Sequence, residues 1–169
     1  MFDLAVCGGH IVTGCGVHRA DIYVRGGIIK EISVDEKSAA ATLDATGKLI
    51  FPGIVDVHVH PMYADRMDTF SISAAFGGTT TIMPFVGSFR AWGGDGDALA
   101  AIDRFVEDAL KSSLIDFGLH LALVSQDMAN LRNIVEGALD RGVSSFKVFM
   151  AYSRRGMKLE DLEIIRVMQ

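Results

Sequence analysis

The chain has 169 residues, of which 50% are hydrophobic and 22% charged, and its 21 acidic residues outnumber its 16 Lys and Arg residues to give a formal net charge of −5. This composition excludes a disordered chain, and the acidic balance argues against nucleic acid or an anionic membrane as the main partner. The apolar runs are shorter than the ~18 residues of a membrane span, and Asp3 stands where a secretory signal would carry basic residues. The chain also has only two cysteines. These features together predict a compact cytoplasmic protein.

Residues 1–52 consist of short apolar runs separated by glycines. Gly8-Gly9 and Gly26-Gly27 each divide two extended runs, and glycine readily takes the positive φ that tight hairpin turns require. We therefore expect this region to be all-β, with its strands paired as antiparallel hairpins.

From residue 53 onward, short apolar strands alternate with amphipathic helices. Asp97 can cap the second of these helices, whose apolar residues then share one face. Four β-then-α units in succession predict a parallel sheet with helices outside it. We expect strands at residues 54–60, 79–85, 117–124 and 144–150, and helices at residues 69–77, 98–110, 131–139 and 159–168.

The length of this α/β region predicts an incomplete barrel. A closed barrel of eight such units takes ~250 residues, so residues 53–169 make about half of one. The helical pattern at residues 164–169 ends without a capping glycine. We therefore expect the chain to be the N-terminal part of a longer protein, with a complete small open α/β sheet as the alternative.

Two histidines stand at the C-terminal end of the first parallel strand. His58 and His60 are two residues apart, so their side chains point to the same side of the strand. Active sites of α/β barrels lie at this end of the strands, and two neutral imidazoles suit Zn²⁺. His120, in the third strand, either faces the barrel mouth or is a hydrogen-bonded core histidine.

Lys147 lies in the middle of the apolar fourth strand. On an edge strand it would be solvated, whereas an unpaired ammonium is costly to bury within a sheet. Burial lowers the pKa of a lysine and exposes the neutral amine. A neutral amine can add CO₂ to give a carbamate, an anionic bidentate ligand that two metal ions could share.

Three segments carry a resemblance to a known family. Phe51–His60, Gly77–Thr81 and Ser145–Tyr152 resemble the hydantoinase/dihydropyrimidinase branch of the amidohydrolase superfamily, and the resemblance covers essentially the whole chain. It implies the first half of a (β/α)₈ TIM-type barrel at residues 53–169, preceded by a small β-sandwich segment at residues 1–52. It also implies a homo-oligomer, a tetramer, that opens cyclic amides of the hydantoin or dihydropyrimidine type.

The resemblance also assigns roles to individual residues. It implies two divalent metal ions, zinc in this family, with His58 and His60 holding the more buried one and Lys147, carboxylated by CO₂, bridging the two. A metal-bridging hydroxide would attack the ring carbonyl, and Tyr152 would hydrogen-bond that carbonyl as its oxyanion develops. The family's other ligands, two histidines and an aspartate, fall beyond Gln169, so we expect the 169-residue chain to be inactive alone.

The sequence leaves the substrate open. Gly77 comes only 17 positions after His60, a shorter distance than expected for the family in a segment that shapes substrate binding. Dihydroorotases carry an arginine two residues after the second histidine, where this chain has Met62, and Arg66 has the spacing seen in allantoinases unless it is a solvated loop residue. The alternatives are therefore an allantoinase- or dihydroorotase-like hydrolase, or a non-catalytic scaffold homologue.

Overall fold

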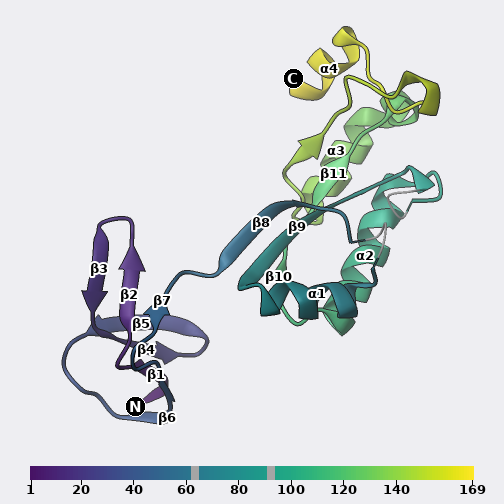
Figure 1. Ribbon diagram of the computed structural model, residues 1–169. Coiled ribbons are helices and arrows are strands. Elements are labelled where there is room, and N and C mark those ends of the chain that lie inside the picture. Colours follow the sequence, from purple (N-terminus) through teal and green to yellow (C-terminus); the bar gives the residue numbers. More distant parts are fainter. Residues whose placement is uncertain (62–64, 91–93) are drawn as a thin grey trace. The chain divides into compact units, whose positions relative to one another are not determined.

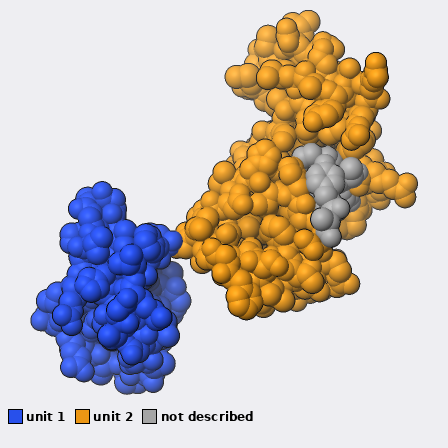
Figure 2. All heavy atoms as spheres, in the orientation of Figure 1, with its two compact units in different colours: residues 1–52 blue, residues 53–169 orange. Residues whose placement is uncertain are grey.

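The computed structural model describes residues 1–61, 65–90 and 94–169. The chain forms two compact units, Met1–Pro52 and Gly53–Gln169 (Figure 2). Within the described ranges, none of the helices combines the length and the apolar character needed to cross a lipid bilayer.

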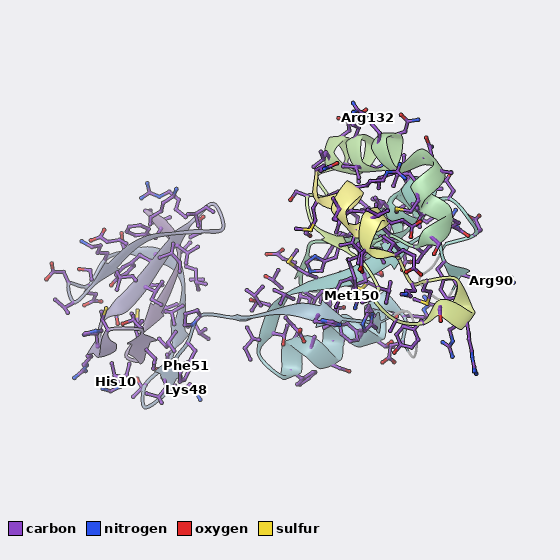
Figure 3. The ribbon with its side chains drawn as sticks, turned by 90° about the horizontal axis from the view of Figure 1, so that it is seen from above. His10, Lys48, Phe51, Arg90, Arg132 and Met150 are labelled. Carbon is purple, nitrogen blue, oxygen red and sulfur yellow. The ribbon has the colours of Figure 1, made fainter. Side chains whose placement is uncertain are left out.

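The first unit is all-β and contains two small sheets. One has the strand order β5-β4-β1-β6 and the other β3-β2-β7. Antiparallel hairpins join β4 to β5 and β2 to β3, and Figure 3 labels His10 and Lys48, which a backbone hydrogen bond of 2.9 Å connects. The strands are β1 (Phe2–Cys7), β2 (His10–Thr13), β3 (Gly16–Arg19), β4 (Asp21–Arg25), β5 (Ile28–Ser33), β6 (Ala39–Asp44) and β7 (Leu49–Ile50).

The expectation of antiparallel hairpins throughout this unit is wrong in part. Gly26-Gly27 does turn a hairpin, but β1 pairs parallel with β6, and β2 pairs parallel with β7. Gly8-Gly9 instead carries the chain from one sheet to the other, and the Gly8 N–H donates to Asp21 Oδ1 at 2.9 Å. Glycine spacing reports only the local turn, whereas these parallel pairs form between strands distant in sequence.

The second unit contains one curled parallel sheet, as the β-then-α alternation predicts. Its strands β8, β9, β11 and β12 follow one another in chain order, and β10 pairs with β9 on the same side as β11. This is the arrangement of half a barrel, while the closed barrel and the β-sandwich stay predictions. The strands are β8 (Ile54–Val59), β9 (Thr79–Gly87), β10 (Asp116–Phe117), β11 (His120–Ala122) and β12 (Phe146–Lys147).

Helices follow the strands of the second unit. Figure 1 shows α2 alongside β9, and α3 packs against α2. Asp97 caps α2 as expected, because its Oδ1 accepts from the N–H groups of Leu99 at 2.9 Å and Ala100 at 3.0 Å. The α-helices are α1 (Met67–Phe76), α2 (Ala98–Ser112), α3 (Leu131–Asp140) and α4 (Asp161–Met168), and two short 3-10 helices are η3 (Ser125–Asn130) and η4 (Ser153–Arg155).

The core of the second unit lies between the sheet and its helices. α1 begins two residues before the expected start, and Leu110, expected on the buried face of α2, is exposed. Partly buried residues of α2, α3 and α4 pack against the largest cluster of buried residues in this unit. The fully buried residues of the largest cluster include Val86, Ala98, Ile102, Leu121, Leu123, Ala138 and Leu159.

Two expected strands are shorter than the apolar runs that predict them. The third breaks at Gly118, whose N–H donates to the Ile82 carbonyl at 2.9 Å, so that β10 and β11 are separate. The fourth is reduced to β12, and Phe149 forms only an isolated bridge with Lys158. An apolar run marks burial, but a strand extends only as far as its neighbour supplies ladder partners.

Close approach of the first three strands depends on two glycines. A Cβ on Gly53 would overlap the side chain of Thr80, and a Cβ on Gly87 would lie 2.6 Å from the carbonyl oxygen of Ala122. The missing side chain of Gly53 lets the start of β8 pass close to Thr80 of β9, and that of Gly87 lets the C-terminal end of β9 approach β11.

Candidate metal centre

His58 and His60 lie side by side at the C-terminal end of β8. Their ring centroids are 5.1 Å apart and the rings meet edge to face at 80°. His58 is exposed and His60 is half-buried. The alternation of side chains along a strand explains why residues two apart meet on the same side.

The aromatic ring of Phe85, on the neighbouring strand β9, lies at the centre of the site. Its centroid is 4.7 Å from that of His58, 5.1 Å from that of His60 and 4.8 Å from that of His120. Phe85 is only 6% exposed, so this ring is fixed by the core beneath it. We call Phe85 and the four side chains against it, those of His58, His60, His120 and Lys147, the Phe85 cluster.

Lys147 reaches the Phe85 cluster from β12. Its Nζ lies 4.5 Å from the ring centroid of Phe85 and 5.2 Å from that of Phe149. Although β12 pairs with β11 alone among the described strands, this lysine is half-buried, and burial lowers its pKa below the ordinary range. The fold therefore gathers His58, His60 and Lys147, from the first and fourth strand positions, around one ring.

The electrostatics of the Phe85 cluster favour neutral nitrogen donors. The pKa of His60 is lowered, first by burial and then by the nearby positive charges of His58 and Lys147. A neutral imidazole is the form that binds a metal ion.

The donor set fits a divalent cation if the lysine is carbamylated. An ammonium at Lys147 would repel such an ion, whereas a carbamate would supply anionic oxygens beside two imidazoles. Across residues 1–61, 65–90 and 94–169, no three side chains of His, Cys, Asp or Glu form a group that could hold a metal ion. Beside the two imidazoles, the Phe85 cluster contains the Lys147 side chain, whose nitrogen lies 4.5 Å from the Phe85 ring centroid.

Tyr152 lies beside Phe149, which in turn contacts Lys147 of the Phe85 cluster. It precedes η4 with φ 67° and ψ 37°, a left-handed conformation that non-glycine residues rarely adopt and that occurs preferentially at functional sites. Its side chain is 60% exposed, and its ring packs edge to face on Phe149 at 6.2 Å. Through Phe149, which also contacts the Lys147 ammonium, the tyrosine is connected to the candidate ligands.

Of three other candidates from the sequence, the structure places His120 and Arg66, and Met62 lies outside the residues that it describes. His120 is hydrogen-bonded, with its Nδ1 2.6 Å from Ser145 Oγ and its Nε2 3.0 Å from the Val57 carbonyl oxygen. The side chain of Arg66 is 83% exposed and faces Asp68, with 3.4 Å between Nη2 and Oδ2, as a solvated loop arginine would be.

Sequence reasoning missed Phe85 and Asp127. Phe85 looks like any apolar strand residue, and only its register opposite His120 places it among the histidines. Asp127 is 3% exposed, its Oδ2 accepts from the Val124 N–H at 2.9 Å, and burial raises the pKa of this carboxyl. No spacing pattern in the sequence marks a lone buried carboxylate.

Known proteins resemble the chain along nearly its whole length. It is 37% identical over 167 residues to a D-hydantoinase of Ralstonia pickettii, covering 94% of this chain and 35% of that protein. It is 31% identical over 168 residues to a dihydropyrimidinase of Arabidopsis thaliana, covering 94% of this chain and 30% of that one. No family model matches the chain.

A solved structure supports the same relationship. The L-hydantoinase (dihydropyrimidinase) from Arthrobacter aurescens superposes with a TM-score of 0.83 and 32% identity, over 100% of this chain and 38% of that one. The chain thus spans about a third of the length of the relatives that it matches.

Proposed function

Because the chain belongs to the hydantoinase and dihydropyrimidinase family, matching about a third of the length of its members, we propose that the protein carrying it is a metal-dependent hydrolase of cyclic amides. The observation that supports this most is the meeting of His58, His60 and Lys147 around Phe85 at the C-terminal side of a parallel sheet. That edge is where α/β barrel enzymes carry their active sites.

His58 and His60 would hold metal through neutral imidazoles. The lowered pKa of His60 keeps that ring unprotonated at pH values where an ordinary histidine is partly charged, so protons compete less with the metal. When bound, a pair of divalent cations would lower the pKa of coordinated water toward about 7 and polarise the substrate carbonyl.

Lys147 would be carbamylated. Its lowered pKa increases the fraction of neutral amine. At a fixed pH well below the pKa, each unit by which the pKa falls multiplies that fraction about tenfold. The ammonium first releases one proton to become the neutral amine, and the amine nitrogen then adds to the carbon of CO₂ and releases a second proton to solvent. A cation thereby becomes an anion. This exchange replaces repulsion of a divalent ion by attraction.

Tyr152 would act on the substrate carbonyl. Its exposed ring leaves the hydroxyl accessible, and the left-handed backbone at this residue fixes the direction in which the side chain leaves the chain. A hydroxyl aimed at the carbonyl oxygen donates its hydrogen bond most strongly as negative charge develops there during attack.

Hydantoins and dihydropyrimidines are the proposed substrates. The carboxylate of dihydroorotate requires a cationic partner, and Arg66 is turned to Asp68 with most of its side chain in solvent. Nothing in the position of Arg66 favours a carboxylated substrate over an uncharged ring.

Ring opening by the metal-replete full-length protein tests this proposal. We expect turnover of dihydrouracil or 5-substituted hydantoins, with allantoin and dihydroorotate as comparison substrates. His60→Asn should abolish turnover, whereas Arg132→Ala should not, because Arg132 projects from α3 with 87% of its side chain exposed (Figure 3). A protein that opens none of the four rings contradicts the function, and preference for allantoin or dihydroorotate reassigns only the substrate.

A further inference from the structure

The first strand of the sheet is irregular where it carries the candidate ligands. The register between β8 and β9 shifts between Asp56 and Val59, and Val59 is opposite Pro84. Proline has no N–H to give to a ladder. The backbone around His58 is therefore held less regularly by β9 than the backbone of a continuous parallel pair.

A side chain from the third strand position reaches this stretch. The Nε2 atom of His120 lies 3.0 Å from the carbonyl oxygen of Val57, although β9 stands between β11 and β8 in the sheet. The imidazole stacks on Phe85 of the intervening strand, with 4.8 Å between centroids and 28° between planes. Its ring thus spans one strand to hold the backbone of the next.

The partner of His120 Nε2 fixes which atom donates in that hydrogen bond. A carbonyl oxygen only accepts, so Nε2 carries the proton. Nδ1 is hydrogen-bonded to Ser145 Oγ at 2.6 Å, and the Ser145 hydroxyl also lies 3.3 Å from the Leu119 carbonyl oxygen. Ser145 is two residues before Lys147, so the same imidazole connects both ligand-bearing segments.

The peptide between Val57 and His58 is held at both ends. His120 binds its carbonyl, and the His58 N–H donates to Asp56 Oδ1 at 3.1 Å. We infer that His120 is a positioning residue, which orients the peptide before His58 and sets the spacing between His58 and Lys147. The inference rests on the proposed function only in taking these two residues as metal ligands.

Two variants of His120 separate hydrogen bonding from packing. His120→Phe keeps a ring against Phe85 and removes both hydrogen bonds. His120→Gln places an amide N–H near the former Nε2 and so can still donate to Val57. The matched control is Ser71→Ala, because the fully buried Ser71 hydroxyl joins α1 to the loop after α2 by accepting from the Leu114 N–H at 3.1 Å.

Two measurements on the full-length protein are compared. Hydrogen exchange of the metal-free protein reports the mobility of residues 54–61, and competition with a chelator reports Zn²⁺ affinity. We expect His120→Phe to speed exchange in this segment and to weaken Zn²⁺ binding about 10- to 100-fold, the usual loss when an outer partner of a metal site is removed. His120→Gln should recover part of both, and Ser71→Ala should lower the melting temperature while leaving Zn²⁺ affinity unchanged.

The outcomes distinguish this inference from the function on which it rests. Unchanged affinity in His120→Phe, with wild type binding Zn²⁺, overturns the positioning role and leaves the function intact. If His120→Phe and Ser71→Ala lose Zn²⁺ affinity equally, His120 is only a structural residue, and the positioning role is also overturned. A wild type that binds no Zn²⁺ overturns the function, and unchanged exchange at residues 54–61 in His120→Phe then overturns the positioning role separately.

Discussion

Replacing Phe85 by leucine should loosen the Phe85 cluster without unfolding the protein. The substitution keeps an apolar side chain at a position that is 6% exposed but removes ring contacts with three histidines and the Lys147 ammonium. A ring pair contributes about 0.5–1.5 kcal/mol beyond area burial, and an exposed cation–π contact about 0.5–1 kcal/mol. Because contacts that share one ring do not add, we expect the free energy of unfolding to fall by about 1–3 kcal/mol. Phe85→Ala should cost about 3–5 kcal/mol, since it also leaves a cavity.

Two assays on metal-free protein measure this effect. Urea denaturation gives the change in the free energy of unfolding, and NMR titration follows the His60 imidazole. Burial is the first cause of the lowered His60 pKa, so loosening the Phe85 cluster should move that pKa up toward its ordinary value. The matched control is Phe105→Leu, because Phe105 packs against Phe117 at 6.0 Å in the helix-facing core. It should destabilise the protein and leave His60 unchanged. An unchanged His60 titration in Phe85→Leu would refute the reasoning.

Three further predictions concern single side chains. Lys147→Ala should abolish hydrolysis by removing the bridging anion, and added acetate or propionate should restore part of it; full activity of the variant without such an anion would contradict the carbamate. Tyr152→Phe should lower kcat about 10²–10³-fold with a smaller change in KM, and a wild-type rate in the metal-replete variant would remove the tyrosine from the mechanism. Burial raises the pKa of Asp127, so its protonated form contributes stability that is present below the unfolded pKa and lost as pH rises through the folded pKa. Asp127→Asn should therefore reduce the loss of stability with rising pH, measured by thermal melts at successive pH values. Asp127→Ala should lower the free energy of unfolding by about 1–3 kcal/mol at every pH, because it leaves the Val124 N–H unsatisfied.

Local patterns predict the second unit well because its elements are local. Asp97 precedes an amphipathic run and caps α2, and the alternation of short strands with helices fixes a parallel sheet. In the first unit the pairs of β1 with β6 and of β2 with β7 join strands far apart in sequence. Glycine turns cannot indicate such pairs, so the antiparallel expectation fails there.

Some features of the candidate site follow from local sequence patterns, and others depend on how distant strands pair. Side-chain alternation is enough to predict that the rings of His58 and His60 meet, and an apolar run is enough to predict that Lys147 is shielded from solvent. The central place of Phe85 and the bond from His120 to the Val57 carbonyl depend on strand register. That register shifts opposite Pro84, and such a shift is set by packing between strands rather than by residues adjacent in sequence.

The central claim is that His58, His60 and Lys147 hold metal, and the metal content of the full-length protein tests it most directly. Elemental analysis should find two divalent ions per chain in the wild type, fewer in Lys147→Ala and His60→Asn, and two in the control Arg132→Ala. One ion or none in the wild-type protein, or two ions in Lys147→Ala without any added carboxylate, would contradict the account.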